Sequence, residues 1–231
     1  MCFSAAASFS AATVLGTAGY FAVKKNTLRT GVAFAMIPFL FAAQQVAEGI
    51  FWLTSTNSIS PAWETPAVFT FLLFAQVIWP AWVPLSVYRA ETVQSRKRSL
   101  IVFAVTGVAL GLYHLYCLCV SPIDAEVNGH HVEYTLYFPS PGGNLSAIFY
   151  VLIGVLYVLV TVFPLFLSSV KRMNVLGLAV LLSFFISLFF YTQYLISVWC
   201  FFAAVISAMV VWVLAEDRSA VGPRLQKETT G

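Results

Sequence analysis

Long apolar stretches separated by short polar segments occupy most of the chain. A helix needs about 20 apolar residues to cross a bilayer, and seven stretches approach or exceed that length. Only Ser197 interrupts the last two. The pattern predicts an all-α integral membrane bundle of seven transmembrane helices within residues 1–216, followed by a disordered polar tail over residues 217–231. The predicted spans are residues 4–23, 31–53, 67–88, 100–120, 145–169, 174–196 and 198–216.

The basic residues fall in alternate loops of this pattern. All 12 Lys and Arg residues lie in segments 24–30, 89–99 and 170–174 and in the tail, whereas segments 54–66 and 121–144 hold none. Loops on the cytoplasmic side of a membrane carry an excess of basic residues. We therefore expect the N-terminus outside and the tail in the cytoplasm.

The composition excludes several classes of protein. With 60% hydrophobic and 9% charged residues, the chain is not a soluble domain, and its expected partner is the lipid bilayer. It has no basic patch with interleaved aromatic residues, so we expect no nucleic-acid partner. No Lys lies in a predicted span, which excludes a retinal Schiff base of the rhodopsin kind.

The longest loop between spans, residues 121–144, has the pattern of a β-hairpin. Asn128 and Gly129 are a pair that favours a two-residue type I′ turn. After the turn, apolar residues alternate along the chain as in a strand with one buried face. We expect the hairpin to lie over the outer mouth of the bundle; its alternating residues are Val132, Tyr134, Leu136 and Phe138.

The second predicted span contains a carboxylate. Gln45, Glu48 and Trp52 are spaced at i, i+3 and i+7, so they share one helix face, and Gly49 beside them would allow a neighbouring helix to approach closely. An ionisable residue within a membrane costs several kcal/mol unless it is paired or hydrated, which makes it a candidate functional residue. The alternative is that Glu48 is a hydrogen-bonded strut between helices.

The predicted topology places all four Cys and all three His residues on the outer side. Thiolate, imidazole and carboxylate groups are ligands of zinc, copper and iron, so a metal site or a reactive thiol is one interpretation. His114 and Cys117, at i and i+3, can share a helix face. Structural disulfides and simple packing of buried thiols are the alternatives. A single His of this kind more often satisfies a local hydrogen bond than ligates a metal.

Four motifs resemble those of an uncharacterised family of bacterial polytopic membrane proteins. They are MCFSA at residues 1–5, QQxxEGxxW at 44–52, WP at 79–80 and SVWCFFAA at 197–204. The resemblance covers nearly the whole chain and implies the bacterial inner membrane, with no established activity. His114 does not match the family pattern. The motif positions that match are Cys2, Glu48, Trp52, Trp199 and Cys200, together with His131 and Tyr134 in the loop.

These observations lead to one principal hypothesis, an outward-facing polar site where the first, second and seventh spans meet. Cys2 and Cys200 would be thiolate ligands or reactive thiols, Glu48 a ligand or proton acceptor, and His131 a further ligand. If Met1 is trimmed, Cys2 carries both an amine and a thiol, which can chelate a metal or act as a nucleophile. Zinc, copper and iron are the candidate metals. The neighbouring binding residues would be Gln45, Trp52, Trp199, Tyr134 and His114.

Two other functions are compatible with the sequence. The chain could transport a small solute or protons, with Glu48 titrating and Pro80 bending a gating helix. It could also be a receptor-like or assembly subunit without chemistry of its own. A small-molecule ligand and an oligomeric assembly are both left open.

Overall fold

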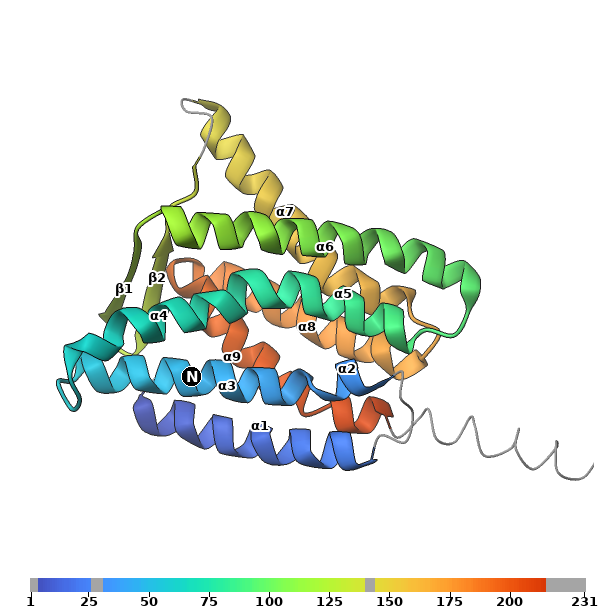
Figure 1. Ribbon diagram of the computed structural model, residues 1–231, viewed down its shortest axis with the longest axis horizontal. Helices are drawn as coiled ribbons and strands as arrows, with labels where there is room; N and C mark the ends of the chain where they lie inside the picture. Colours follow the sequence, from blue (N-terminus) through green and yellow to red (C-terminus); the bar gives the residue numbers. More distant parts are fainter. Residues whose placement is uncertain (1–3, 26–30, 140–143, 215–231) are drawn as a thin grey trace, which may run out of the picture.

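The computed structural model describes residues 4–25, 31–139 and 144–214. Within these residues, seven helices are long and apolar enough to cross a membrane, as the hydrophobic pattern predicts. They lie side by side as one bundle, with a small two-stranded sheet at one end (Figure 1). The predicted tail at 217–231 lies outside the described residues.

Two of the first three spans are built from several helical pieces. The first is α1 (Ala5–Lys25), and the second joins α2 (Val32–Ala35) to α3 (Ile37–Ser55). The third consists of a 3₁₀ turn, η2 (Pro61–Trp63), then α4 (Glu64–Leu72), η3 (Leu73–Ile78) and α5 (Trp79–Ala90). The segment η3 is a π-helix, which has a wider turn than an α-helix. Such segments are rare in proteins, and where they occur they often lie at functional sites.

The remaining spans are α6 (Gln94–Val120), α7 (Asn144–Leu167), α8 (Lys171–Phe190) and α9 (Leu195–Ser207), with helical structure again at residues 210–214. The break between the last two spans falls at Tyr191, followed by the 3₁₀ turn η4 (Thr192–Tyr194), rather than at Ser197. Ser197 is instead a buried residue within α9. A serine can remain in a membrane helix because its hydroxyl finds an acceptor, so it does not have to mark a boundary.

The loop after α6 forms the predicted hairpin, with one difference in the turn. Strands β1 (Ile123–Asn128) and β2 (His131–Leu136) pair antiparallel, with Asn128 opposite His131. The two turn residues are therefore Gly129 and His130, one position later than predicted. Gly129 has φ 64°, and it is the only described residue of this turn with positive φ, which is the pattern of a type II′ turn. The glycine takes the first central position because it has no Cβ to oppose that conformation.

The two ends of the bundle differ in charge. All Lys and Arg residues among the described ones lie at the end opposite the hairpin, in or beside Lys24–Lys25, the α5–α6 connection and the start of α8. We call this the basic end, and the other the hairpin end. The hairpin itself carries Asp124, Glu126 and Glu133.

A buried carboxylate holds the basic end together. Glu91, 2% exposed, accepts hydrogen bonds from the backbone N–H groups of Thr92 and Val93 and from both the N–H and the hydroxyl of Ser169, at 2.7 to 2.9 Å. Arg96 donates to the carbonyl oxygens of Leu167 and Ser168 at 3.2 and 2.6 Å. The connection between α5 and α6 is thereby fastened to the connection between α7 and α8.

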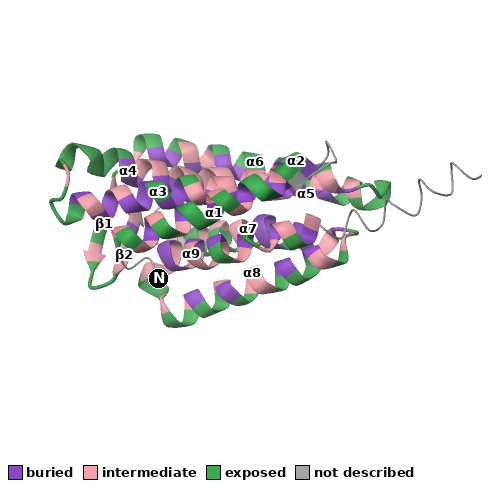
Figure 2. Cartoon of the chain, turned by 90° about the horizontal axis from the view of Figure 1, so that it is seen from below, coloured by how far each residue is buried: buried purple, intermediate pink, exposed green. Residues whose placement is uncertain are grey.

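The outer surface of the bundle is apolar, as contact with lipid requires. Large apolar side chains on α6, α7 and α8 are exposed, for example Val105, Leu152 and Phe189. Figure 2 shows α8 along one side of the bundle, with many exposed and half-buried positions along its length. Buried residues concentrate on α3, which lies in the interior against α1, α4 and α9.

Candidate functional site

Glu48 lies on α3 in the interior of the bundle, with no exposed surface. Its Oε1 accepts a hydrogen bond from the hydroxyl of Ser197 at 2.8 Å, and its Oε2 accepts one from Nε2 of Gln45 at 3.2 Å. Gln45 is one turn earlier on the same helix, as the i, i+3 spacing predicts. Ser197 comes from α9, so the carboxylate joins the second and seventh spans.

Cys200 is brought to the same place by the helix that carries Ser197. It follows Ser197 by three residues, so both side chains lie on the same face of α9. The thiol is buried, and its surroundings include the Gln44 amide and the Glu48 carboxylate. Two residues of the predicted site, Glu48 and Cys200, are therefore neighbours in the fold.

Gln44 links this site to the third span. Its Oε1 accepts a hydrogen bond from the indole N–H of Trp79 at 2.7 Å. The Trp79 ring stacks on Phe41, with 3.8 Å between ring centroids, so both its polar and its apolar parts are held. Trp79 is the first residue of α5 and precedes Pro80. These two contacts therefore hold the third span at the point where its π-helix becomes an α-helix.

Several buried polar atoms in this part of the bundle have no hydrogen-bond partner among the described residues. Buried polar groups in proteins are nearly always hydrogen-bonded, so exceptions point to bound water, an ion or a ligand. Among the residues that the structure describes, no hydrogen-bond partner is found for Gln44 Nε2, Gln45 Oε1 and Trp52 Nε1, or for the hydroxyl of Ser8 on α1. The interior at the hairpin end thus offers both donors and acceptors.

The hairpin covers this part of the bundle. Val132 and Tyr134 are buried in one apolar cluster with Phe51, Trp52 and Cys200. The Tyr134 ring stacks on Phe71, with 4.3 Å between centroids. The predicted apolar face of the second strand is therefore the one that packs against the bundle.

The first span closes the other side. The ring of Phe9 lies so close to Gly49 that a Cβ at position 49 would be 2.8 Å from it. The expectation that Gly49 admits a neighbouring helix is confirmed, and α1 is that helix. Ala5, at the start of α1, packs against the cluster that holds Trp52 and Cys200. Cys2 itself lies outside the described residues.

His131 lies at the start of β2, which packs beside η4. Its ring stacks on Tyr194 at 4.8 Å between centroids and lies 5.3 Å from the ring of Tyr191. Burial lowers the pKa of His131 below its ordinary value, and the neighbouring His130 acts in the same direction. In the part of the chain that is described, no three His, Cys, Asp or Glu residues are grouped as a metal site would require.

The described cysteines are free thiols. Cys117 and Cys200 are buried, and Cys119 is exposed. Nδ1 of His114 lies 2.8 Å from the carbonyl oxygen of Gln76, and Cys117 is a neighbour of Tyr113. His114 is thus hydrogen-bonded to the third span, and its role as a ligand stays a prediction.

The missing N–H of Pro80 explains the hydrogen bond between His114 and Gln76. The sequence analysis predicted neither this bond nor the π-helix. Pro80 has no N–H, so it cannot donate to Gln76 in an α-helical turn or to Ala75 in a π-helical one. His114 bonds the Gln76 carbonyl, and the hydroxyl of Tyr157 donates to the Ala75 carbonyl. Pro80 was the available signal, since the carbonyls four and five residues before a membrane proline must find other donors.

The α6 helix packs closely against the backbone of the third span through two glycines. Gly107, Gly111 and His114 follow at i, i+4 and i+7, one face of the helix. A Cβ at Gly107 would lie 1.9 Å from the carbonyl oxygen of Pro80, and one at Gly111 would lie 2.7 Å from that of Val77. This face is therefore shaped to the irregular third span.

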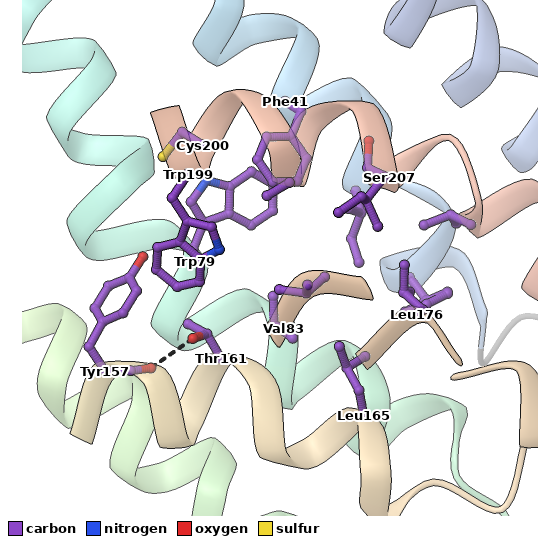
Figure 3. A pocket seen from close by; sticks show the side chains of 16 residues that line it. Phe41, Trp79, Val83, Tyr157, Thr161, Leu165, Leu176, Trp199, Cys200 and Ser207 are labelled. Atoms are coloured by element: carbon purple, nitrogen blue, oxygen red, sulfur yellow. Dashed lines mark hydrogen bonds between the residues drawn. The ribbon is translucent and has the colours of Figure 1, made fainter. Parts of the chain in front are cut away.

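A small apolar cavity lies beneath the site, between α3, α5, α7, α8 and α9. Its volume is about 70 Å³, and Cys200, Trp199 and Tyr157 form the end nearest Glu48. Figure 3 shows the Tyr157 hydroxyl on the same side of the cavity as Cys200, with aliphatic residues such as Leu165 and Leu176 at the far end. This cavity supplies no charged group.

Comparisons with known proteins give a family and no activity. No curated protein and no solved structure matches the chain. The expectation of an uncharacterised family is confirmed, because the match to a family of unknown function extends over almost the entire sequence. Since that match covers residues 1–225, the chain belongs to the family of unknown function DUF6629.

Proposed function

We propose that this membrane protein binds a transition-metal ion in an outward-facing site built from Cys2, Glu48 and Cys200. The donor atoms would be two thiolate sulfurs, one carboxylate oxygen and, after removal of Met1, the terminal amine of Cys2. Four donors of this kind suit the tetrahedral coordination of zinc, and soft thiolates also suit copper and iron.

One observation carries the proposal, the hydrogen bond between Ser197 and Glu48. It joins residues 149 positions apart and sets α9 so that Cys200 lies beside the carboxylate. Burying a carboxylate within a membrane bundle is costly unless its charge is stabilised. A bound cation would stabilise that charge.

Two further observations support Cys2 as a ligand and the outward orientation of the site. Ala5 packs against the cluster that contains Cys200, and Cys2 is three residues before it in the sequence. The described Lys and Arg residues lie at the opposite end of the bundle. If that end is cytoplasmic, the site faces outward.

The test is elemental analysis of the full chain, purified in detergent without a histidine tag or chelator. We expect about one equivalent of zinc, copper or iron per chain in the wild type, as tetrahedral single-ion sites bind. Cys2→Ser and Cys200→Ser should lose the metal, and Glu48→Gln should retain less. Cys119→Ser is the matched control, because Cys119 is a free, exposed cysteine at the same end; it should retain full occupancy.

Metal-free wild-type protein, or equal metal in all four variants, would refute the metal site. If the wild type is metal-free, counting the accessible thiols separates reactive cysteines from cysteines that only pack in the interior. If Glu48→Gln changes only the stability of the fold, Glu48 is a strut, and the assembly-subunit interpretation gains support.

A second candidate, transport of protons or a small solute, is favoured by the π-helix. A wide turn followed by Pro80 and Pro84 is a place where a membrane helix bends, and Glu48 lies one helix away, linked through Gln44 and Trp79. Proteoliposomes loaded with a pH-sensitive dye test this function. A proton flux that Glu48→Gln abolishes would favour it over the metal site.

A further inference from the structure

A cavity bordered by His114 lies at the hairpin end, between η3, α6, α7, α8 and α9. Its volume is about 320 Å³, at the lower end of the range of pockets for small molecules. Most of its wall is apolar or aromatic, as in binding sites for ligands with a flat ring. The aromatic residues of the wall are Phe138, Tyr150, Tyr157, Phe184 and Trp199.

His114 supplies this cavity with a hydrogen-bond acceptor. The side chain is 1% exposed, and its Nδ1 lies 2.8 Å from the Gln76 carbonyl oxygen. A carbonyl only accepts hydrogen bonds, so Nδ1 carries the hydrogen, and in the neutral ring Nε2 then holds a lone pair. Nε2 is buried and finds no partner in residues 4–25, 31–139 and 144–214. A buried acceptor of this kind calls for a hydrogen-bond donor.

Trp199 adds a donor at the same cavity. Its ring packs edge-on against Phe184 and Tyr157, with centroids 4.9 and 5.8 Å away. Its Nε1–H group is buried and also lacks a partner within the described part of the chain. An indole nitrogen only donates, so the wall offers one acceptor and one donor.

The cavity lies next to the lipid-facing surface. Val151 and Val155 of α7 line it, and they are 64% and 51% exposed. A ligand that is dissolved in the bilayer would therefore meet the cavity without crossing the aqueous phase. Cys200 is also part of the wall.

We propose that this cavity binds a membrane-soluble phenol or hydroquinone, a single hydroxylated ring with an alkyl tail. The ring hydroxyl donates to Nε2 of His114, the ring lies among the aromatic side chains, and the tail leaves past Val151 and Val155 into the lipid. An oxygen on the ring can accept from Nε1 of Trp199. The inference rests on His114 and the cavity, and it does not depend on a metal at Glu48.

The test compares two probes that differ only in the hydrogen-bond donor, 4-hexylphenol and 4-hexylanisole. The full chain is placed in lipid nanodiscs, and bound probe is measured by equilibrium dialysis. We expect one phenol per chain and about tenfold weaker binding of the anisole, the effect of losing one hydrogen bond. Equal affinity of the two probes would overturn the proposal and indicate an acyl chain as the occupant. Absence of binding would overturn it as well and indicate water.

A variant at His114 locates the site. His114→Asn places an amide N–H near the position of Nδ1, so the bond to Gln76 can remain, and it removes the acceptor at Nε2. We expect about tenfold weaker binding of 4-hexylphenol and little change for 4-hexylanisole. Tyr116→Phe is the matched control, because Tyr116 lies on the same helix but is 58% exposed and does not line the cavity.

Undiminished phenol binding by folded His114→Asn would overturn the assignment of Nε2. If His114→Asn fails to fold, the comparison of the two probes on the wild type still decides whether a hydroxyl is recognised. Trp199→Phe then replaces His114→Asn as the variant that locates the site. Glu48→Gln should bind the phenol as the wild type does, so a failure at the metal site and a failure here are distinguishable.

Discussion

The hydroxyl of Ser197 lies 2.8 Å from Oε1 of Glu48, and this bond crosses from α9 to α3 inside the bundle. It joins two motifs near opposite ends of the chain and fixes the relative rotation of the two helices. Because the carboxylate has no exposed surface, each donor that it has contributes to keeping its charge in the interior.

Replacing Ser197 with alanine should destabilise the fold. The change removes a donor from a buried carboxylate oxygen, and we expect a loss of about 1–3 kcal/mol in the free energy of unfolding. The measurement is unfolding in mixed detergent micelles followed by circular dichroism. Ser207→Ala is the matched control, because Ser207 is also buried on α9 but donates only to the Ala204 carbonyl of its own helix. Equal losses in the two variants would show that the Glu48 bond is not special.

Gly107→Ala should prevent the close contact between α5 and α6. The new methyl group would lie 1.9 Å from the Pro80 carbonyl oxygen, and backbone on both sides would have to move. We expect a destabilisation of about 3 kcal/mol or more, visible as a loss of folded protein after purification.

Gly154→Ala on α7 provides the control for that change. Nothing lies within 4 Å of a Cβ at position 154, so this variant should be as stable as the wild type. If both glycine variants fold equally well, the close contact between Gly107 and the Pro80 carbonyl is contradicted.

The stability of the basic end should depend on pH through Glu91. Burial by itself raises the pKa of this carboxyl, but the hydrogen bonds from Val93, Ser169 and Thr92 hold it below its ordinary value of 4.5. The folded state therefore binds the proton less readily than the unfolded state. The stabilisation is fully present above pH 4.5 and is lost as the pH falls through the lower, folded pKa.

Glu91→Gln should remove this pH dependence. Relative to the wild type, the variant should be less stable at neutral pH, and the difference should shrink as the pH falls below 4.5. Melting temperatures across this range test it. Glu126→Gln, which changes an exposed carboxylate in β1, should follow the wild type. A constant difference between the wild type and Glu91→Gln at all pH values would contradict the prediction.

Labelling of Cys119 should reveal the orientation of the bundle. Cys119 is exposed at the hairpin end, whereas Cys117 and Cys200 are buried. If the hairpin end is outside, a membrane-impermeant maleimide added to intact spheroplasts should label a Cys2→Ser variant, and the further change Cys119→Ser should remove that label.

A cysteine at the other end completes the experiment. Val93, 41% exposed, lies in the α5–α6 connection at the basic end. Val93→Cys in the Cys2→Ser, Cys119→Ser background should react only after lysis. The reverse result would place the hairpin in the cytoplasm, and the proposed outward-facing site with it.

The sequence alone predicts the seven membrane helices because that information is local. A run of apolar residues reports burial in lipid whatever its neighbours are. The hairpin is predicted for the same reason, from alternation and a turn signal, although its turn is shifted to Gly129 and His130. The shared face of Gln45, Glu48 and Trp52 likewise follows from helical geometry.

The tertiary structure decides which of these helices meet and which polar atoms find each other. Seven apolar helices have similar surfaces, so the neighbour of each depends on the fit of individual side chains, such as Phe9 against Gly49. The sequence treated Ser197 as a break, but in the fold it is a donor to Glu48. It placed Pro80 at a kink, but only the fold supplies Tyr157 and His114 for the carbonyls that this proline leaves without donors. A polar group in lipid must be satisfied, and its partner comes from whichever helix packs against it.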